Sequence, residues 1–258
     1  MKSVLQNPQK FLKSDCVMEV KKFEVLPRHI GFIMDGNGRW AKNQGLKRGE
    51  GHIAGAKVFK KIGEYCADLG IECVTFYAFS TENWSRPQEE VDGLMDLFID
   101  YLIDGDSRLE ENKERQMKLK FIGEREGLPE ELLELIEKAE RETKDYNKIT
   151  VNIALNYGGR AELVHSVKTI AEKVKNGEIA IEDINEDLIS QNIYTSGQPD
   201  PDIIVRPSGE YRLSNFLTWQ SAYSEFWFSD ILWPDFTTDD VDAVLEDYQK
   251  RHRRFGGV

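Results

Sequence analysis

The sequence predicts a single α/β domain with a mainly parallel β-sheet flanked by helices. Short apolar runs with strand character alternate along the chain with longer segments of helical periodicity. Such alternation is typical of parallel strands joined by helical crossovers. We expect strands at residues 29–34, 73–79, 119–122, 150–155, 203–205 and 225–228.

Four helices are predicted from apolar side chains that recur every three or four residues and so share one face. They span residues 87–103, 129–139, 161–175 and 238–251. The sequence contains no internal repeat, low-complexity tract or linker, so one domain is the simplest account. Because open parallel sheets bind ligands beyond the carboxyl ends of their strands, we expect a site in the loops that follow the strands.

Composition and charge narrow the class of protein. Of the 258 residues, 40% are hydrophobic, which is enough to bury a sizeable core. The 46 acidic and 34 basic residues give a formal charge of −12, which argues against a general nucleic-acid binder. The three cysteines lack metal-type spacing and fit a reducing compartment.

The start of the chain carries charges where a signal peptide needs an apolar segment. No uncharged apolar run approaches the roughly 20 residues that span a bilayer, so we expect a cytoplasmic protein. Residues 1–26 form a weakly amphipathic pattern that ends at Pro27. We interpret them as an N-terminal appendage to a catalytic domain at residues 27–258.

The first predicted strand runs directly into Asp35-Gly36-Asn37-Gly38-Arg39-Trp40. Glycines permit a close approach of backbone N–H groups to a ligand, and the helix that follows directs its positive end at an anion. A carboxylate beside a phosphate repels it unless a cation intervenes, so Asp35 suggests a bridging Mg²⁺. A simple turn with Asp35 as a local cap explains the segment equally well.

The same segment spells Gly36-x-Gly38-x-x-Ala41, a variant of the dinucleotide fingerprint. That fingerprint requires a second strand that ends in an acidic residue about 20 positions on, whereas residues 55–68 have the pattern of a helix. Dinucleotide binding is therefore a secondary alternative. Arg48 and His52 share a helix face and extend the anion site, unless they are an ordinary solvated arginine and a surface histidine.

The second predicted strand ends in Ser80-Thr81-Glu82-Asn83-Trp84-Ser85-Arg86. Small hydroxyl and amide residues often cap the next helix, and capping alone explains Ser80, Thr81 and Asn83. An indole and a guanidinium side by side, at Trp84 and Arg86, instead suit a ligand with one apolar and one anionic end.

The densest polar segment follows the fifth predicted strand and runs from Arg206 to Phe216. Its two arginines, its serines and its glycine turn offer forked donors and hydroxyls to a second diphosphate. A polar loop with a Glu210 salt bridge is the alternative. Glu225 begins the sixth predicted strand and is either a capped strand residue or a second metal carboxylate.

Four segments resemble the cis-prenyltransferases, in particular the bacterial undecaprenyl diphosphate synthases. They read HIGFIMDGNGRWAK, YAFSTENWSRP, NIALNYGGRAE and IIVRPSGEYRLSNFLTWQSAYSEFWFSDILWPDF. The resemblance extends from about residue 27 to residue 257, in order and at the family's spacing. One departure is Pro207, where the family usually has threonine, and it removes a side-chain hydrogen bond while leaving Arg206 and Arg212 in place.

The resemblance implies a homodimeric enzyme with a hydrophobic tunnel beside its parallel sheet. Such an enzyme condenses isopentenyl diphosphate repeatedly onto an allylic primer such as farnesyl diphosphate, with Mg²⁺ as cofactor and new double bonds in the cis form. For a bacterial-type sequence it implies undecaprenyl diphosphate, a cell-wall lipid carrier, as product. The helix face formed by Val91, Leu94, Met95, Phe98 and Leu102 is then either a tunnel wall or plain core.

The resemblance also implies roles for single residues. It places Mg²⁺ at Asp35, which helps the allylic diphosphate depart, and at Glu225, supplied by this subunit or its partner. The residues that bind the allylic diphosphate are Gly36, Asn37, Gly38, Arg39, Arg48 and His52, flanked by Trp40. Those at the reacting centre are Ser80, Thr81, Glu82 and Asn83. Among them, Asn83 is the catalytic residue that assists proton removal. Trp84 and Arg86 position the substrate. Isopentenyl diphosphate binds to Arg206, Arg212, Leu213 and Ser214.

Two other classes remain as alternatives. The first is a noncatalytic partner subunit of a prenyltransferase complex, and the intact Asp35 and Arg206 loops argue against it. The second is a dinucleotide-dependent oxidoreductase. A growing polyprenyl chain must enter lipid, so we also expect transient contact with the inner face of the membrane, through the amphipathic start or the basic tail at residues 250–254.

Overall fold

The structure is a computed structural model, and it describes residues 21–104 and 113–251. Within these ranges six strands form one sheet in the order β3-β4-β2-β1-β5-β6, and all neighbouring pairs are parallel. The strands are β1 (His29–Ile33), β2 (Cys73–Ser80), β3 (Met117–Ile122), β4 (Ile149–Tyr157), β5 (Ile203–Arg206) and β6 (Glu225–Phe228). The predicted single α/β domain with a parallel sheet is confirmed.

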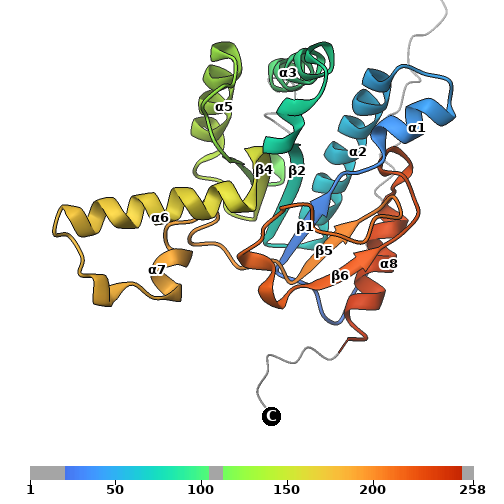
Figure 1. Cartoon of the computed structure of the whole chain (residues 1–258). Helices are drawn as coiled ribbons and strands as arrows, with labels where there is room; N and C mark the ends of the chain where they lie inside the picture. Colours follow the sequence, from blue (N-terminus) through green and yellow to red (C-terminus); the bar gives the residue numbers. More distant parts are fainter. Residues whose placement is uncertain (1–20, 105–112, 252–258) are drawn as a thin grey trace, which may run out of the picture.

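The helices connect the strands as crossovers (Figure 1). The α-helices described are α1 (Asn37–Asn43), α2 (Arg48–Leu69), α3 (Gln88–Ile103), α5 (Glu130–Thr143), α6 (Gly159–Lys175), α7 (Glu186–Ser190) and α8 (Thr238–Tyr248). Short 3₁₀ turns are η1 (Thr81–Ser85), η3 (Ile181–Asp183), η4 (Gln220–Tyr223) and η5 (Trp233–Asp235). In Figure 1, α6 and α7 extend to one side of the sheet, away from the other helices.

Alternating strand residues divide the core between the two faces of the sheet. On one face, α2 and α8 cover a cluster that contains Phe32 and Phe76, while α3 and α5 cover a second cluster around Ile153. On the other face, no helix supplies the centre of the cluster; the loop residues Phe216 and Leu217 are fully buried there. The loop that follows β5 is therefore part of the core, which fixes its position.

The strand order reverses direction at β1, because β2 lies on one side of β1 and β5 on the other. Loops that leave the carboxyl ends of two such strands diverge, and the crevice between them is the usual ligand site of an open α/β sheet. The loops in question begin at Asp35, after β1, and at Arg206, at the end of β5. The topology therefore brings together two polar segments that are far apart in the sequence.

Part of the predicted N-terminal appendage packs on the domain. Phe23 and Leu26 contact the cluster beneath α2 and α8. Residues 1–20, and residues 252–254 of the predicted basic tail, lie outside the described residues. In the described part of the chain, no helix has the length and apolar character that crossing a bilayer requires.

A buried polar network lies at the amino end of the sheet, opposite the ligand crevice. The His29 ring donates from Nδ1 to the carbonyl of Pro199 at 2.7 Å and accepts at Nε2 from the hydroxyl of Thr75, also at 2.7 Å. Asn152 donates to the same hydroxyl. Burial lowers the pKa of His29 from 6.5 to about 4, so this ring is neutral at pH 7.

The depressed pKa of His29 predicts acid destabilisation. Between pH 6.5 and about 4 the unfolded chain binds a proton at this residue and the folded chain does not, so the free energy of unfolding falls as the pH falls. The contribution is up to about 3 kcal/mol. Urea unfolding of wild type and of His29→Gln across this pH range measures this contribution. The free energy of unfolding should change less steeply with pH in the variant than in wild type. Equal slopes would contradict the assignment.

Candidate active site

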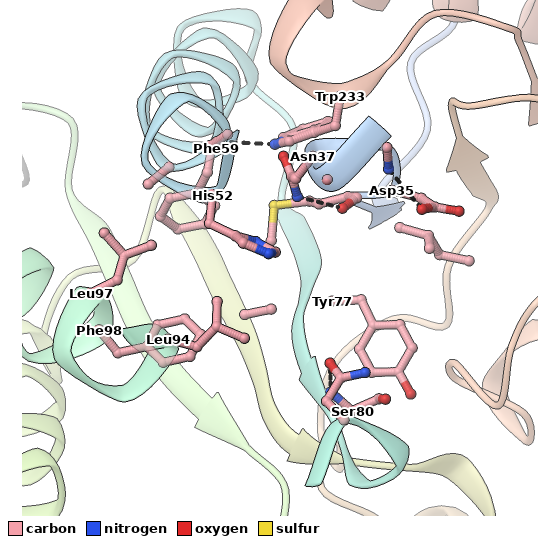
Figure 2. Close-up of a pocket in the computed structure, with 18 of the residues that line it drawn as sticks. Asp35, Asn37, His52, Phe59, Tyr77, Ser80, Leu94, Leu97, Phe98 and Trp233 are labelled. Atoms are coloured by element: carbon pink, nitrogen blue, oxygen red, sulfur yellow. Dashed lines mark hydrogen bonds between the residues drawn. The ribbon is translucent and has the colours of Figure 1, made fainter. Parts of the chain in front are cut away.

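A pocket of about 700 Å³ opens at the crevice between the β1 and β5 loops. This volume is in the range of small-molecule sites. Figure 2 shows Phe59, Leu94, Leu97 and Phe98 gathered on one side and Asp35, Tyr77 and Ser80 on the other. Polar loops thus form one part of the lining and apolar helix faces form the rest. The pocket suits a ligand with an anionic end and an apolar end.

Asp35 and Arg206 form an ion pair that joins the two loops. The Arg206 guanidinium is 2.8 Å from Asp35 Oδ2, and its side chain is only 4% exposed. Burial raises the pKa of Asp35, but hydrogen bonds from Arg206 and Ser208 and the charge of Arg206 outweigh it and leave the pKa below its ordinary value. Asp35 is therefore a carboxylate at neutral pH, and it lines the pocket.

The segment predicted as an anion cradle is the start of α1. Gly36 precedes the helix with φ of 103°, a left-handed conformation that favours glycine, and its N–H donates to Asp35 Oδ1 at 2.7 Å. Residues from Gly36 to Arg39 all line the pocket. The free N–H groups of the first turn thus lie beside the carboxylate, as the sequence indicated.

Two glycines of α2 allow the cradle to approach this helix closely. An added Cβ at Gly51 would lie 2.1 Å from the main-chain oxygen of Asn37, and one at Gly55 would lie 2.3 Å from Asn37 Oδ1. Trp233 packs at the same place on α2, where its indole N–H donates to the carbonyl of Gly55 at 3.0 Å. The sequence analysis missed Trp233, whose place in the pocket follows only from the tertiary packing of η5 on α2.

Three basic residues meet around one carboxylate at the pocket edge. Glu90 Oε1 lies 2.9 Å from Arg48 Nε and 2.8 Å from Arg86 NH1, and His52 Nε2 is 4.0 Å away. The predicted residues Arg48, His52 and Arg86 are therefore brought together and line the pocket. Glu90 was missed, although its spacing of four from Arg86 at a helix start was the available signal.

His52 is neutral at pH 7. Burial and the charges of Arg86 and Arg48 lower its pKa to about 4, against a smaller opposing effect of Glu90. Its Nε2 is buried and has no hydrogen-bond partner among the described residues. A neutral imidazole nitrogen beside two arginines can donate to or accept from a phosphate group without adding charge.

The loop after β2 contributes Ser80, Glu82 and Asn83 to the pocket. Asn83 Oδ1 accepts from the N–H of Ser80 at 3.1 Å, so the capping interpretation holds for this pair while both residues remain in the lining. Glu82 Oε1 accepts from Asn215 Nδ2 at 2.8 Å. Burial raises the pKa of Glu82, but hydrogen bonds, foremost that from Asn215, outweigh it and lower the pKa.

The loop after β5 presents Arg212 and Ser214 to the pocket beside Arg206. Ser214 Oγ accepts from Arg206 NH1 at 2.8 Å and from Arg212 Nε at 3.2 Å. Arg212 also pairs with Glu210, as the alternative interpretation of this loop expected. Arg39 donates to the carbonyl of Ser208 at 2.8 Å and so ties α1 to this second loop.

Five predicted site residues do not line the pocket: Trp40, Thr81, Trp84, Leu213 and Glu225. The indole of Trp40 donates to Asp235, and that of Trp84 donates to Asn156, each at 2.7 Å. Leu213 packs against the core on the far face of the sheet. Glu225 begins β6 at the amino end of the sheet and pairs with Arg251 at 2.8 Å, so within one chain it does not join Asp35.

The apolar side of the pocket runs along α3. Leu94, Phe98 and Leu102, one helical turn apart, face the pocket, whereas Val91 and Met95 pack in the core with α5. The helix face that was predicted as either tunnel wall or core is therefore divided between the two. Tyr77, Ala78 and Ile153 from the sheet also line the pocket.

A cation at this site would depend on Asp35 and on the ligand. Among residues 21–104 and 113–251, no group of three or more His, Cys, Asp or Glu side chains forms a metal cluster. Mg²⁺ is usually held in proteins by one or two carboxylates together with phosphate oxygens, rather than by an all-protein cage. The ionised carboxylate of Asp35, beside the start of α1, fits that kind of site.

The crevice at the switch point of this parallel sheet is lined by two polar loops and by apolar helix faces, as a site for an amphipathic ligand requires. Residues 33–256 match the family model described as "Putative undecaprenyl diphosphate synthase". The chain therefore belongs to this prenyltransferase family, and it is a prenyltransferase enzyme. This assignment replaces the oxidoreductase alternative.

Known proteins agree with the family assignment. The chain is 50% identical over 233 residues to the isoprenyl transferase of Clostridium perfringens, covering 90% of this chain and 91% of that protein. It is 47% identical over 252 residues to the isoprenyl transferase of Bacillus subtilis, covering 98% of this chain and 94% of that protein. Both relatives match almost throughout their length, so the resemblance is not limited to the site.

Solved structures share the fold. The lavandulyl diphosphate synthase of Lavandula x intermedia, in complex with dimethylallyl diphosphate, has a TM-score of 0.85 and 36% identity, covering 90% of this chain and 98% of that chain. A "probable undecaprenyl diphosphate synthase" from Campylobacter jejuni has a TM-score of 0.72 and 31% identity, covering 90% of this chain and 100% of that chain. The same fold thus occurs in proteins named for different prenyl products.

The contact between Gly51 and Asn37 predicts a matched pair of variants. Gly51→Ala should displace the start of α1 from the pocket, because its Cβ would overlap the main-chain oxygen of Asn37. We expect kcat/KM for prenyl transfer to fall roughly 10- to 100-fold. Gly49→Ala, on the same helix with nothing within 4 Å of the added Cβ, should retain activity. Equal activity of the two variants in a prenyl-transfer assay would refute the argument.

Proposed function

We propose that this enzyme is a Mg²⁺-dependent cis-prenyltransferase. It condenses isopentenyl diphosphate sequentially onto an allylic diphosphate, with farnesyl diphosphate as primer, to make a long-chain polyprenyl diphosphate. The proposed product is undecaprenyl diphosphate, a carrier lipid for cell-wall synthesis. The observation that carries the proposal is the continuity between the two anion-binding loops and the apolar channel along α3.

The allylic diphosphate would bind at the first loop, with its hydrocarbon tail in the channel. N–H groups of the first turn of α1 and the side chains of Arg39, Arg48 and Arg86 supply donors to its phosphates. Mg²⁺ held by Asp35 would neutralise charge that develops on the departing diphosphate. His52 adds a neutral ring nitrogen to the same group of donors.

Isopentenyl diphosphate would bind at the second loop through Arg206, Arg212 and Ser214. The Asp35–Arg206 ion pair supports this arrangement, because it joins the two loops that we propose as diphosphate sites. The allylic carbon–oxygen bond breaks, a carbon–carbon bond forms to the isopentenyl double bond, and a proton is lost. Asn83 lies where its amide could orient the groups involved in this proton loss, and holding both reactants in register lowers the barrier.

Quaternary structure and cellular location belong to the proposal as well. We propose a homodimer in which Glu225 of the partner subunit is the second metal carboxylate, because Glu225 in the same chain lies at the other end of the sheet. We propose a cytoplasmic enzyme that contacts the membrane surface when it releases product. A noncatalytic partner subunit is disfavoured by the ionised Asp35 and its pairing with a buried arginine.

The dependence on metal and on Asp35 can be tested together. The purified chain, farnesyl diphosphate, radiolabelled isopentenyl diphosphate and Mg²⁺ should give polyprenyl products, and excess chelator should abolish them. Asp35→Asn should lower kcat roughly 10²-fold or more, because it removes the carboxylate that would hold the cation. Asp96→Asn, an exposed residue of α3 outside the pocket lining, is the control. Chelator-resistant synthesis would rule out the proposed mechanism.

Chain length should depend on the far end of the channel. Leu102 lies about 18 Å along the α3 axis from Glu90 at the pocket edge. Leu102→Ala would enlarge this end, and we expect the product distribution to shift to longer chains by thin-layer chromatography. Ile103→Ala changes the adjacent residue, which is 51% exposed and absent from the pocket lining, and should leave the distribution unchanged. An identical shift in both variants would count against the channel.

A further inference from the structure

Asn215 connects three loops that follow three different strands. It lies after β5 in a turn where Ser214, Asn215 and Leu217 have positive φ values of 50°, 65° and 44°. Asparagine tolerates this left-handed conformation better than most residues. The turn is anchored by Phe216 and Leu217, which are fully buried on the face of the sheet opposite α2. Its position is therefore set by the core.

The first connection runs to the start of α6, after β4. The main-chain oxygen of Asn215 accepts from the N–H of Gly159 at 2.7 Å, and its Oδ1 accepts from the N–H of Arg160 at 2.8 Å. The residue at the N-cap position of α6 is Gly158, which has no side chain to cap the helix. Asn215 therefore satisfies N–H groups that a local cap would otherwise satisfy.

The second connection runs to Glu82, after β2. Asn215 Nδ2 donates to Glu82 Oε1 at 2.8 Å, and both residues line the pocket. The orientation of the amide is determined chemically, because a carboxylate only accepts and a backbone N–H only donates. An added Cβ at Gly158 would lie 2.7 Å from Asn215 Nδ2, so this glycine leaves room for the amide.

The third connection is covalent. Ser214, the preceding residue, accepts from both Arg206 and Arg212. A shift of the Asn215 turn would therefore move the hydroxyl around which the two arginines of the second anion loop are arranged. Nothing in the sequence marked Asn215 as different from the polar residues beside it.

We propose that Asn215 is a positioning residue that holds Glu82 and the second diphosphate site in register. It acts through Glu82 and Ser214 and is not required to contact substrate itself. The inference rests on the proposed function, which assigns the second loop to isopentenyl diphosphate. Its specific consequence is that loss of the hydrogen bond to Glu82 weakens the binding of isopentenyl diphosphate more than the binding of the allylic diphosphate.

Asn215→Asp is the most informative single variant. It keeps an oxygen for the N–H of Arg160 and tolerates positive φ, so the cap of α6 is retained. It replaces the donor toward Glu82 with an oxygen, so two carboxylates would face each other. We expect KM for isopentenyl diphosphate to rise about tenfold, with KM for the allylic diphosphate changed less than about threefold. A variant with wild-type constants would overturn the proposal.

A second background shows whether the effect passes through Glu82. Glu82→Gln alone can still accept from Asn215, and Glu82→Gln combined with Asn215→Asp restores a hydrogen bond of reversed polarity. The tenfold penalty of Asn215→Asp should therefore shrink to less than about threefold in the Glu82→Gln background. An equal penalty in both backgrounds would exclude the connection to Glu82.

Asn192→Ala provides the matched control. Asn192 also makes two side-chain hydrogen bonds at 2.7 Å, to Lys173 and to the carbonyl of Leu188, but it lies outside the pocket lining. Its kinetic constants should equal those of wild type. Two measurements separate the two proposals. Wild type that makes no polyprenyl product in the radiolabel assay refutes the proposed function, whereas equal affinity of wild type and Asn215→Asp for isopentenyl diphosphate, measured by calorimetric titration, refutes the role of Asn215.

Discussion

The ion pair between Asp35 and Arg206 is the contact on which the geometry of the site depends. Buried ion pairs add little net stability, because desolvation opposes the Coulombic gain, but they fix the relative position of their partners. Here the partners follow β1 and β5, the two strands at the switch point. The pair holds an anion-binding loop on each side and keeps a carboxylate ionised between them. Asp35 would hold a cation there, and that cation would supply positive charge to a bound anionic group.

The parts of the site that follow a strand directly could be predicted from the sequence. Asp35, Ser80 and Arg206 come at or just after the ends of strands, and parallel pairing places all strand ends at one edge, so their proximity follows from topology. Glu90 and Trp233 could not be found this way. Glu90 lies in the polar first turn of a helix, where its spacing from Arg86 suggests an ordinary helix pair, and the additional contact with Arg48 comes from another helix.

The predicted residues that lie outside the pocket show what sequence proximity leaves undetermined. Trp84 follows Asn83 directly, yet the 3₁₀ turn directs its indole to Asn156. Glu225 shares a polar neighbourhood in the sequence with the serines before it, but it begins a strand, and the beginning of a parallel strand is far from the edge that binds ligands. Motif spacing identifies which residues are near a site, whereas backbone conformation and strand direction decide which side chains enter it.

The apolar stripe of α3 illustrates a limit of periodicity. Val91 and Leu94 have the same chemistry and are both buried in the cluster that α5 helps to cover, but only Leu94 also lines the pocket. A channel stays open only where its walls are braced, since protein interiors otherwise close to crystal-like packing density. Phe59 provides such bracing, because its ring packs edge-on against two other rings. The distance between ring centroids is 4.6 Å to Phe76 of the core and 5.5 Å to Tyr101. These contacts join α2 to the sheet and to α3 beside the pocket, and such bracing is a property of paired side chains that no single helix pattern contains.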